Sequence, residues 1–509
     1  MPESFCKIIS LEEIEDQATR CHKDGKRIVL CHGTFDLLHA GHIRHLQSAR
    51  KEGDVLFVTV TCDKQVNKGP GRPVFPERLR AENLAALTCV DYVAINESPT
   101  AINIIPKIRP HAYIKGSDYK NASDDLTGNI ILERNAVEAC GGRIVFTDDI
   151  TFSSTNLLNE HFGVFTPETQ EYLNEFKKNN SSENVIKQLQ SLKNLNVLVI
   201  GDAIIDEYLY TVPLGQAAKG THLSVKYEAT EKFAGGSLAV ANHIAGFVNS
   251  VALVSGLGKT NNHEDFIRSK LAPNVKPHFY YFDDAPTVLK RRFVDGDLNK
   301  LFEVYFYNEK PSIDKLSKEV CSWLEENTEK FDIVCTPDFG NGFISTAMIE
   351  ELCSHSNFLA VNTQVNSGNR GYHAISSYPR ADFISLNGPE LRMATHNRFS
   401  PLETLAEEVA EKTKSNYFAV TLGSKGAILL DKEQNKIYKA PVLSTKVLDR
   451  IGAGDTFLSL ASICLKGGLS GEVTLFVASA AAALDVQVIC NREFITPINL
   501  FKYIATLLK

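Results

Sequence analysis

Two segments of the chain share one design, an apolar run followed at once by a turn rich in glycine and aspartate. Residues 27–31 lead into His32-Gly-Thr-Phe-Asp36, and residues 196–200 lead into Gly201-Asp202. Short apolar runs of this kind are typical of buried parallel strands. Since ligands of open α/β sheets gather at the carboxyl ends of the strands, each turn predicts a ligand site.

Strand and helix patterns alternate after both segments, which favours parallel sheets. In the first part of the chain, strand patterns cover residues 54–60 and 90–94, and helix patterns cover residues 42–51 and 77–87. In the second part, strand patterns cover residues 251–254, 333–335, 358–361, 383–385 and 418–421. We therefore expect an α/β protein with two domains, each built on a doubly wound, largely parallel sheet.

A polar, charged stretch separates the two alternating regions. It contains Lys177-Lys-Asn-Asn-Ser-Ser-Glu183, and 509 residues are too many for one hydrophobic core. We predict one domain over 1–165, a helical or flexible linker over 166–194 and a second domain over 195–509. Strand-like pieces between Tyr208 and Phe233 interrupt the alternation and predict a small β lid.

Composition excludes several classes of protein. The net charge of -7 offers no basic field for a nucleic acid, so we expect no nucleic-acid partner. Neither a signal segment nor a long apolar run is evident in the sequence, so we expect a cytoplasmic protein without a membrane partner. The 11 cysteines form no C-x-x-C pair and are interpreted as reduced, mostly buried thiols.

The first turn carries two histidines where a strand gives way to a helix. Gly33 and Gly41 allow the backbone to approach a phosphate, and a helix N-terminus favours negative charge. His39 and His42 could then stabilise the charge that develops at an α-phosphate under attack. A histidine pair alone is equally compatible with two side chains that only satisfy the start of a helix.

The longer string, His32-Gly-Thr-Phe-Asp-Leu-Leu-His-Ala-Gly-His42, resembles the H-x-G-H signature of cytidylyltransferase-like nucleotidyltransferases. Three later strings are also similar to that family: Lys68-Gly-Pro-Gly-Arg-Pro-Val-Phe-Pro-Glu-Arg78, Lys115-Gly-Ser-Asp-Tyr119 and Phe152-Ser-Ser-Thr-Asn156. The resemblance implies catalytic roles for His39, His42 and Lys68, and substrate binding by Arg78. It implies nucleotide binding by Gly33, Thr34, Phe35, Asp36, Gly41, Lys115, Asp118, Ser153, Ser154 and Thr155.

The same resemblance implies a reaction. A phosphate of the substrate attacks the α-phosphate of ATP or CTP and pyrophosphate leaves, with Mg2+ shielding the triphosphate. The sequence does not choose between ATP and CTP. Read singly, the basic residues are also compatible with a solvated charge run, and the serines with an ordinary helix cap.

The second site is predicted by Asp449-Arg-Ile-Gly-Ala-Gly-Asp-Thr-Phe457, a turn of small residues ahead of an apolar helix pattern. Backbone N–H groups of Gly452, Ala453 and Gly454 would cradle a transferring γ-phosphate. Asp455 would accept the proton of an attacking hydroxyl. The string resembles the G-A-G-D signature of ribokinase-like carbohydrate kinases, which implies ATP as the phosphate donor.

Further strings support this second resemblance, over roughly residues 195–500. Gly201-Asp-Ala-Ile-Ile-Asp206 and the pair Gly235-Gly236 resemble the sugar-side motifs, which implies substrate binding by Asp202, Asp206, Gly235 and Gly236. Asn387-Gly-Pro-Glu390 resembles the N-x-x-E element, which implies that Asn387 and Glu390 arrange phosphate, with Glu390 arranging magnesium. Thr421-Leu-Gly-Ser-Lys-Gly426 resembles the nucleotide-side turn, which implies nucleotide binding by Thr421, Gly423 and Gly426.

Two departures from the pattern bear on the sugar. Ala239 stands where heptose kinases of this family have asparagine, and the segment usually reading D-P-K is Asn362-Thr-Gln364. An amide cannot replace an ammonium charge, so contacts on this side are altered. Two interpretations remain for Lys290, Arg291 and Arg292: they compensate for these altered contacts, or they are solvated surface charges.

The pairing of the two domains resembles bifunctional heptose-7-phosphate kinases and heptose-1-phosphate adenylyltransferases, with the domain order inverted. It implies a nucleotide-activated sugar for cell-surface polysaccharide such as lipopolysaccharide or capsule, with a sugar or sugar phosphate and a nucleoside triphosphate as partners. Relatives commonly form dimers or larger assemblies, so we expect a homo-oligomer. Two alternatives remain: CTP-dependent activation of another sugar or polyol phosphate, or a kinase-like domain that only regulates the nucleotidyltransferase.

Overall fold

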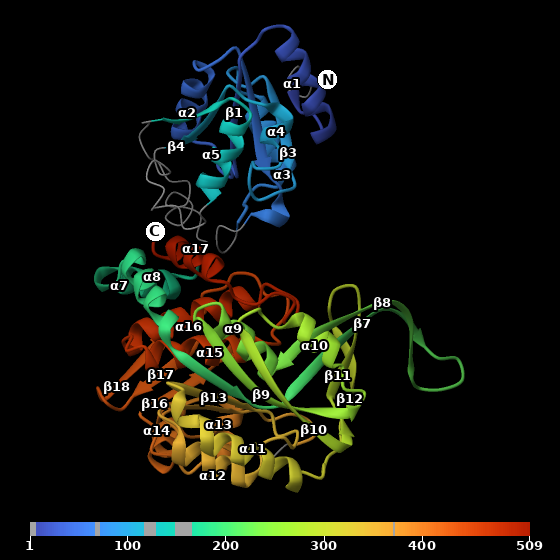
Figure 1. Cartoon of the computed structure of the whole chain (residues 1–509), viewed down its shortest axis with the longest axis vertical. Helices are drawn as coiled ribbons and strands as arrows, with labels where there is room; N and C mark the ends of the chain where they lie inside the picture. Colours follow the sequence, from blue (N-terminus) through green and yellow to red (C-terminus); the bar gives the residue numbers. More distant parts are fainter. Residues whose placement is uncertain (1–6, 67–71, 117–128, 148–164, 370–371) are drawn as a thin grey trace. The chain divides into compact units, whose positions relative to one another are not determined.

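The computed structural model describes residues 7–66, 72–116, 129–147, 165–369 and 372–509 (Figure 1). The chain divides into two units. The N-terminal unit is Met1–Thr166 with Phe501–Leu507 and Lys509, and the C-terminal unit is Pro167–Leu500 with Leu508. Among the described residues, no helix combines the length and the apolar character that a membrane span requires.

The N-terminal unit contains a five-stranded sheet in the order β3-β2-β1-β4-β5, with every neighbouring pair parallel. Its strands are β1 (Ile28–Gly33), β2 (Val55–Thr61), β3 (Tyr92–Asn96), β4 (Ala112–Gly116) and β5 (Arg143–Thr147). Its described helices are α1 (Leu11–Lys23), α2 (Ala40–Arg50), α3 (Glu77–Ala85), α4 (Ile105–Ile108) and α5 (Asn129–Ala139).

Helices cover both faces of this sheet. Leu46 of α2 and Leu84 of α3 pack in one buried cluster. Ile14 of α1, Ile105 of α4 and Val137 of α5 pack in another. β2 lies between the two layers and is buried along its whole length, as its run of apolar and β-branched residues requires. The expected doubly wound sheet is confirmed.

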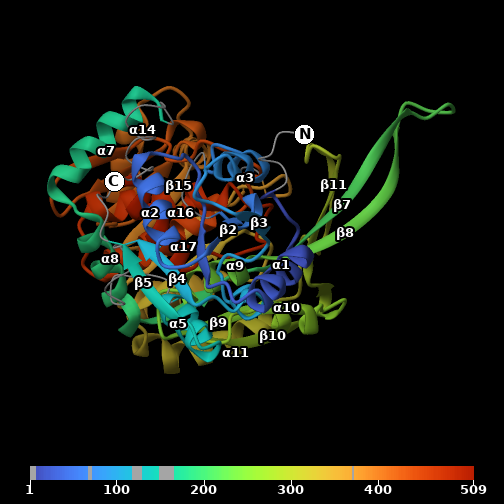
Figure 2. The same cartoon turned by 90° about the horizontal axis from the view of Figure 1, so that it is seen from above.

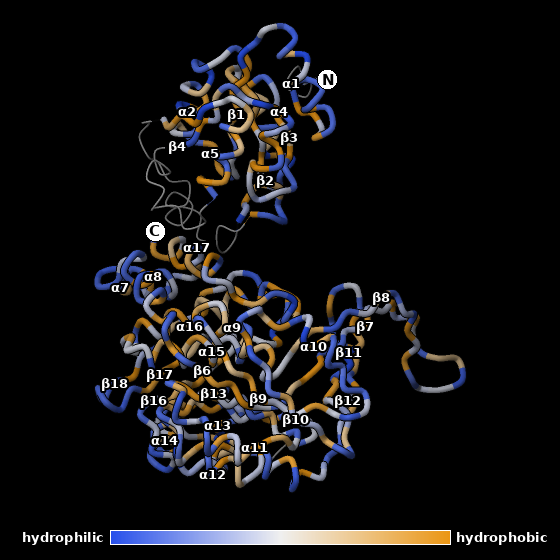
Figure 3. Tube along the Cα trace, viewed as in Figure 1, coloured by the Kyte–Doolittle hydropathy of each residue, from blue (hydrophilic) through white to orange (hydrophobic). Residues whose placement is uncertain are grey.

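The C-terminal unit contains a nine-stranded sheet in the order β10-β9-β6-β13-β14-β15-β16-β17-β18, parallel except at β17 and β18. Its strands are β6 (Asn196–Ile200), β9 (Ser250–Thr260), β10 (Val275–Pro286), β13 (Ile333–Asp338), β14 (Leu359–Thr363), β15 (Phe383–Asn387), β16 (Tyr417–Thr421), β17 (Ala427–Asp431) and β18 (Lys436–Ala440). Its helices include α9 (Ser237–Ala245), α10 (Glu264–Lys270), α11 (Asp314–Asn327), α12 (Thr346–His355), α13 (Gly388–Thr395), α14 (Leu402–Lys412), α15 (Ala453–Lys466) and α16 (Gly471–Asp485). Figure 3 shows hydrophobic residues concentrated on the central strands and hydrophilic residues at the periphery.

Residues 166–194 contain two helices, α7 (Pro167–Asn179) and α8 (Ser182–Ser191). Phe176 of α7 stacks on Phe476 of α16 with ring centroids 4.2 Å apart. Ser181 caps α8 by accepting a hydrogen bond from the backbone N–H of Asn184. These helices therefore pack as part of the C-terminal unit.

A separate four-stranded sheet, in the order β12-β11-β7-β8, forms the lid. β7 (Ala203–Gln216) and β8 (Leu223–Gly236) make a long antiparallel hairpin that projects from the layered body in Figures 1 and 2. β11 (Val288–Val294) pairs in parallel with β7, and β12 (Lys300–Phe306) forms the edge. The expected β lid is confirmed, but it is larger than the sequence predicted, because Lys290-Arg291-Arg292 concealed the third strand.

Candidate functional sites

The first candidate site follows β1 at the carboxyl edge of the N-terminal sheet. Gly33, Thr34, Phe35 and Asp36 form the turn between β1 and α2, and Phe35 adopts a left-handed φ of 50°. Thr34, Phe35 and Asp36 are buried. The sequence thus places this turn at the edge where ligands of α/β sheets bind.

His39 and His42 lie against each other at the start of α2. Their rings stack with centroids 4.0 Å apart, and Phe35 packs edge-on against His42. His39 Nδ1 accepts a hydrogen bond of 3.1 Å from the backbone N–H of Gly41, and burial lowers the pKa of His39. A neutral ring that accepts at Nδ1 carries its proton on Nε2, so His39 can donate a hydrogen bond from that atom.

Asp36 lies against the segment that leads into α3. Its Oδ1 accepts hydrogen bonds from the backbone N–H groups of Val74 and Phe75 at 2.8 and 3.0 Å. Arg72 approaches Oδ2 at 3.6 Å. Asp36 therefore ties the first turn to the chain that follows the basic segment around Lys68.

Arg80 of α3 was not singled out from the sequence, yet it is fully buried. It donates to the backbone carbonyls of Thr34, Thr61 and Phe75, at 2.5, 2.8 and 2.8 Å, and pairs with Asp63 at 2.6 Å. One guanidinium thus joins the turn after β1, the end of β2 and the segment before α3.

Lys115 is the penultimate residue of β4, the strand beside β1, and forms an ion pair of 2.9 Å with Glu133. Burial and the charge of Lys115 lower the pKa of His32 to about 4, so that ring is neutral near pH 7. The predicted Arg78 is 82% exposed and lies against Glu82 at 3.4 Å. The predicted residues Lys68, Asp118, Ser153, Ser154 and Thr155 lie outside the described residues.

The second candidate site is the turn at the start of α15. Gly452 caps the helix with a φ of 101°, and a Cβ atom at this position would lie 2.6 Å from Asn491 Oδ1. A Cβ atom at Gly454 would meet nothing within 4 Å, so space beside the turn is open. A helix start presents backbone N–H groups that have no carbonyl partner within the helix, which is the arrangement that the predicted anion cradle needs.

Asp455 stands in the first turn of α15, where several charges converge. Burial raises the pKa of Asp455 to about 7, and the charge of Asp206 contributes in the same direction. The charges of Lys290 and Glu390 also act on it, with opposite signs. A carboxylate that titrates near neutral pH suits a general base.

Asp206 of β7 is buried and pairs with Arg292 of β11. Lys290 is buried on the same strand face, between the rings of Tyr305 and Phe339 at 5.3 and 5.8 Å. Burial lowers the pKa of Lys290. Of the two interpretations left open for these basic residues, solvated surface charges are therefore excluded for Lys290 and Arg292.

Asp202 has a different environment from Asp206. Its carboxylate accepts backbone N–H groups of Phe339, Asn341 and Phe343 at 3.1 to 3.4 Å. Burial and the charge of Asp338 raise the pKa of Asp202. The Asp202 carboxylate therefore anchors the loop after β13.

Gly236 packs beside Asp202, because a Cβ atom at Gly236 would lie 2.5 Å from the Asp202 carbonyl oxygen.

Asn387 and Glu390 form a capping box at the start of α13. The Asn387 side chain accepts from the Glu390 backbone N–H, and Glu390 Oε2 accepts from the Asn387 N–H, both at 2.8 Å. Glu390 Oε1 accepts from the Val365 N–H at 3.3 Å. Each oxygen keeps a further lone pair, so Glu390 could still accept hydrogen bonds from the water shell of a magnesium ion.

The nucleotide-side residues lie at the end of β16 and in the turn that follows. Thr421 is the last residue of β16, and Gly423 begins a short 3-10 turn. Gly426 ends this turn with a φ of 87°, and a Cβ atom there would lie 2.0 Å from the Ala440 carbonyl oxygen. A glycine is required where the turn contacts the end of β18.

The two departures from the sugar-side pattern differ in burial: Ala239 is buried, and Asn362 and Gln364 are half-buried. Ala239 is buried in α9. The Asn362 side chain donates to the Ser385 carbonyl at 2.6 Å, and the Gln364 backbone N–H donates to the Asp338 carbonyl at 2.9 Å. Asn362 therefore joins β14 to β15.

Comparisons with known proteins match both parts of the chain. A family described as "pfkB family carbohydrate kinase" matches residues 194–493. The chain belongs to the pfkB carbohydrate kinase family. A second family, described as "Cytidylyltransferase-like", matches residues 30–160. This pfkB protein is therefore a transferase that combines a carbohydrate kinase domain with an N-terminal nucleotidyltransferase domain. The two families imply sugar phosphates and nucleoside triphosphates as substrates.

Curated relatives match this pfkB chain over part of its length. "Bifunctional protein HldE" of Syntrophotalea carbinolica is 36% identical over 156 residues, which cover 30% of each chain. "Bifunctional protein HldE" of Pelobacter propionicus is 42% identical over 138 residues, 27% of each chain. The match thus spans less than a third of the length of these relatives.

Solved structures support the fold of the kinase part. Phosphofructokinase-2 from Escherichia coli, in complex with substrates and products, superposes with a TM-score of 0.50 at 16% identity. The superposition covers 62% of this chain and 100% of that one. At this identity the similarity shows the fold alone.

Proposed function

We propose that this chain makes a nucleotide-activated sugar by two transfers. The C-terminal unit phosphorylates a hydroxyl of a sugar, sugar phosphate or polyol with ATP. The N-terminal unit transfers AMP or CMP onto a 1-phosphate-like group and releases pyrophosphate. A heptose phosphate destined for cell-surface polysaccharide is the substrate that the resemblance to bifunctional HldE proteins favours.

The environment of Asp455 carries the kinase half of this proposal. Its pKa of about 7 lets the carboxylate take a hydroxyl proton near neutral pH. The deprotonated oxygen attacks the γ-phosphorus, the bond to the bridging oxygen breaks, and ADP leaves. Backbone N–H groups at Gly452 and Gly454 face the charge that develops on the transferring group.

Magnesium fits the site as a partner of the triphosphate. It would shield the charge of the phosphate oxygens when bound. Glu390 would hold its water shell from the start of α13, where both carboxylate oxygens are fixed by backbone N–H groups.

The nucleotidyl transfer rests on His39, His42 and Lys115. The attacking phosphate oxygen forms a bond to the α-phosphorus, and the bond to the pyrophosphate oxygen breaks. His39 donates from Nε2 to an α-phosphate oxygen, which stabilises the charge of the transition state. Lys115 adds a positive charge at the end of β4.

A buried basic pair favours a substrate that itself carries an anion. Lys290 and Arg292 lie on one face of β11: Arg292 pairs there with Asp206, and the charge of Lys290 acts on Asp455. Arg292 pairs with both Asp206 and Glu303, whereas Lys290 forms no ion pair with any described residue. A sugar phosphate would supply an anion for Lys290, which agrees with a heptose 7-phosphate. Lys290 would then compensate for the absence of an ammonium group at Gln364, which directly follows β14.

A product screen of the full chain tests the proposal. We would offer ATP and CTP in turn with a panel of sugars, sugar phosphates and polyol phosphates, and detect products by mass spectrometry. Asp455→Asn should strongly lower ADP formation only, and His39→Ala should strongly lower pyrophosphate release only. Product from CTP alone would favour activation of another polyol or sugar, and absence of any ADP-forming turnover would identify the kinase half as regulatory.

A further inference from the structure

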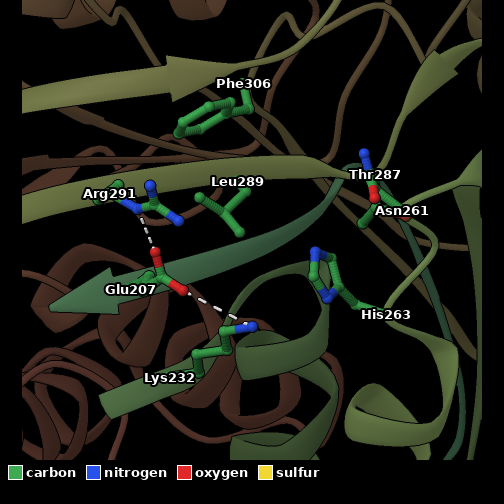
Figure 4. A pocket seen from close by; sticks show the side chains of 8 residues that line it. All are labelled: Glu207, Lys232, Asn261, His263, Thr287, Leu289, Arg291 and Phe306. Atoms are coloured by element: carbon green, nitrogen blue, oxygen red, sulfur yellow. Dashed lines mark hydrogen bonds and ion pairs between the residues drawn. The ribbon is translucent and has the colours of Figure 1, made fainter. Parts of the chain in front are cut away.

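A pocket of about 220 Å³ lies on the lid, apart from the two sites above. Figure 4 shows its walls, which come from all four strands of the lid and from the loops beside it. It is lined by Glu207, Lys232, Asn261, His263, Thr287, Leu289, Arg291 and Phe306.

The pocket and the proposed sugar site occupy opposite faces of the same two strands. Asp206 and Arg292 pair on one face, while Glu207 and Arg291 pair on the other, because successive side chains of a strand alternate. The pocket therefore cannot be an extension of the site around Asp206. It is a separate cavity on the outer face of the lid.

Charge in the pocket is predominantly positive. Glu207 lies between two cations, since it pairs with Arg291 and approaches Lys232 at 3.6 Å. Two positive groups against one carboxylate leave a net charge of +1. The carboxylate also fixes both cations at the pocket wall, and Phe306 packs on the Arg291 guanidinium at 5.0 Å.

Hydrogen-bond donors remain available around the cavity. Arg291 binds Glu207 through Nε, and within the described part of the chain its two terminal nitrogens make no hydrogen bond. The side chains of Asn261 and His263 likewise make no hydrogen bond to any described residue, and both face the cavity in Figure 4. Thr287, by contrast, is engaged with Gly258 and Asn262.

We propose that this pocket binds a small phosphate-bearing anion, held by Arg291, Lys232, His263 and Asn261. Planar guanidinium and ammonium groups are the usual protein partners of phosphate oxygens. The volume is that of roughly seven water molecules, which is room for a phosphate group and a small organic part. The proposal goes beyond the two transfers and does not depend on either.

Calorimetric titration of the full chain with inorganic phosphate tests the site. Asn261→Asp keeps the shape of the side chain and adds a negative charge, so affinity should fall about tenfold. Lys232→Ala should weaken binding to a similar extent. Glu207→Gln should act in the opposite direction and tighten binding several-fold, because it removes the competing carboxylate.

Two controls make the result decisive. Lys226→Ala removes a lysine that lies outside the pocket on β8, the strand that carries Lys232, and should leave the affinity for phosphate unchanged. Phosphate also fits the turn at Gly452, but binding there would not respond to the lid variants. A phosphate affinity that is the same in wild type, Asn261→Asp and Glu207→Gln would overturn the proposal, and unfolding of one variant leaves the other two to decide.

Discussion

Gly235 lies so close to Asp206 that a Cβ atom on the glycine would come within 2.1 Å of the carboxylate oxygen Oδ2. Asp206 is buried and held on its other side by Arg292. The carboxylate therefore has no room to retreat from a side chain at position 235. Glycine at this position leaves room for the Asp206 carboxylate, which we propose binds the sugar.

Gly235→Ala should displace Asp206 and raise the KM for the sugar at least tenfold, with a smaller effect on the KM for ATP. The physical reason is overlap with a fixed buried group, which must move or rotate. Steady-state kinetics of ADP formation measures both constants. Gly296→Ala is the matched control, because a Cβ atom there would meet nothing within 4 Å.

Asp455→Asn should lower kinase turnover by on the order of a hundredfold or more, the usual scale for loss of a general base. In the wild type, kcat/KM should fall as pH drops below about 7, because protonation removes the base. Nucleotidyl transfer in the same chain should keep its rate. A pH profile of ADP release that stays flat between pH 5.5 and 8 is the outcome that contradicts this assignment.

The same residue predicts a change in stability with a defined sign. The pKa of Asp455 rises from its ordinary value of 3.8 to about 7 in the folded state. At a pH between these two values, Asp455 keeps its proton in the folded state and has lost it in the unfolded state. The contribution of Asp455 to stability therefore falls as pH rises through this window. Asp455→Asn should stabilise the chain at pH 8, by at most about 4 kcal/mol, and not at pH 4. Thermal unfolding at the two pH values measures the difference.

Nine strands of the two large sheets, β1–β3, β6, β9 and β13–β16, could be predicted because they are short apolar runs, and β2 and β13 are buried throughout. Sequence patterns did not identify β4, β5, β10, β17 and β18. β11 could not be recognised in the same way. Lys290-Arg291-Arg292 looks like a surface charge run, but strand alternation sends the central residue to one face and its neighbours to the other. The signal was the flanking pair Leu289 and Phe293, which follows the same period of two.

Site residues divide in a similar way. The helix start beside Gly452 and Asp455 could be predicted from the string alone, since a glycine with positive φ and a helix start are local features. Arg80 could not, because only the folded sheet brings three separated carbonyls to one guanidinium. The capping role of Glu390 is local and could have been deduced from Asn387-Gly-Pro-Glu390, a capping-box pattern.

His39→Ala or His42→Ala should cut nucleotidyl transfer by on the order of a hundredfold while ADP formation continues. His39→Asn is the informative companion, since its amide can still donate a hydrogen bond, and it should retain more activity than the alanine variant. Pyrophosphate release measures the rate. Equal rates in wild type and His39→Ala would remove this histidine from the mechanism.

Arg80→Met should loosen three segments at once. It keeps much of the side-chain length but leaves the carbonyls of Thr34, Thr61 and Phe75 without their donor. A loss of about 3 kcal/mol or more from the N-terminal unit is expected, because unsatisfied buried acceptors keep their desolvation cost.

Hydrogen–deuterium exchange measures this effect locally. Amides in residues 32–36, 61–63 and 74–75 should exchange faster in Arg80→Met. For the exchange measurement, Arg78→Met is the matched control on the same helix. The Arg78 side chain is 82% exposed, and its one ion pair with a described residue is with Glu82. Since the first turn belongs to the proposed nucleotide site, nucleotidyl transfer should fall with Arg80→Met and kinase activity should not. Unchanged exchange at residues 32–36 would show that Arg80 does not hold the turn in place.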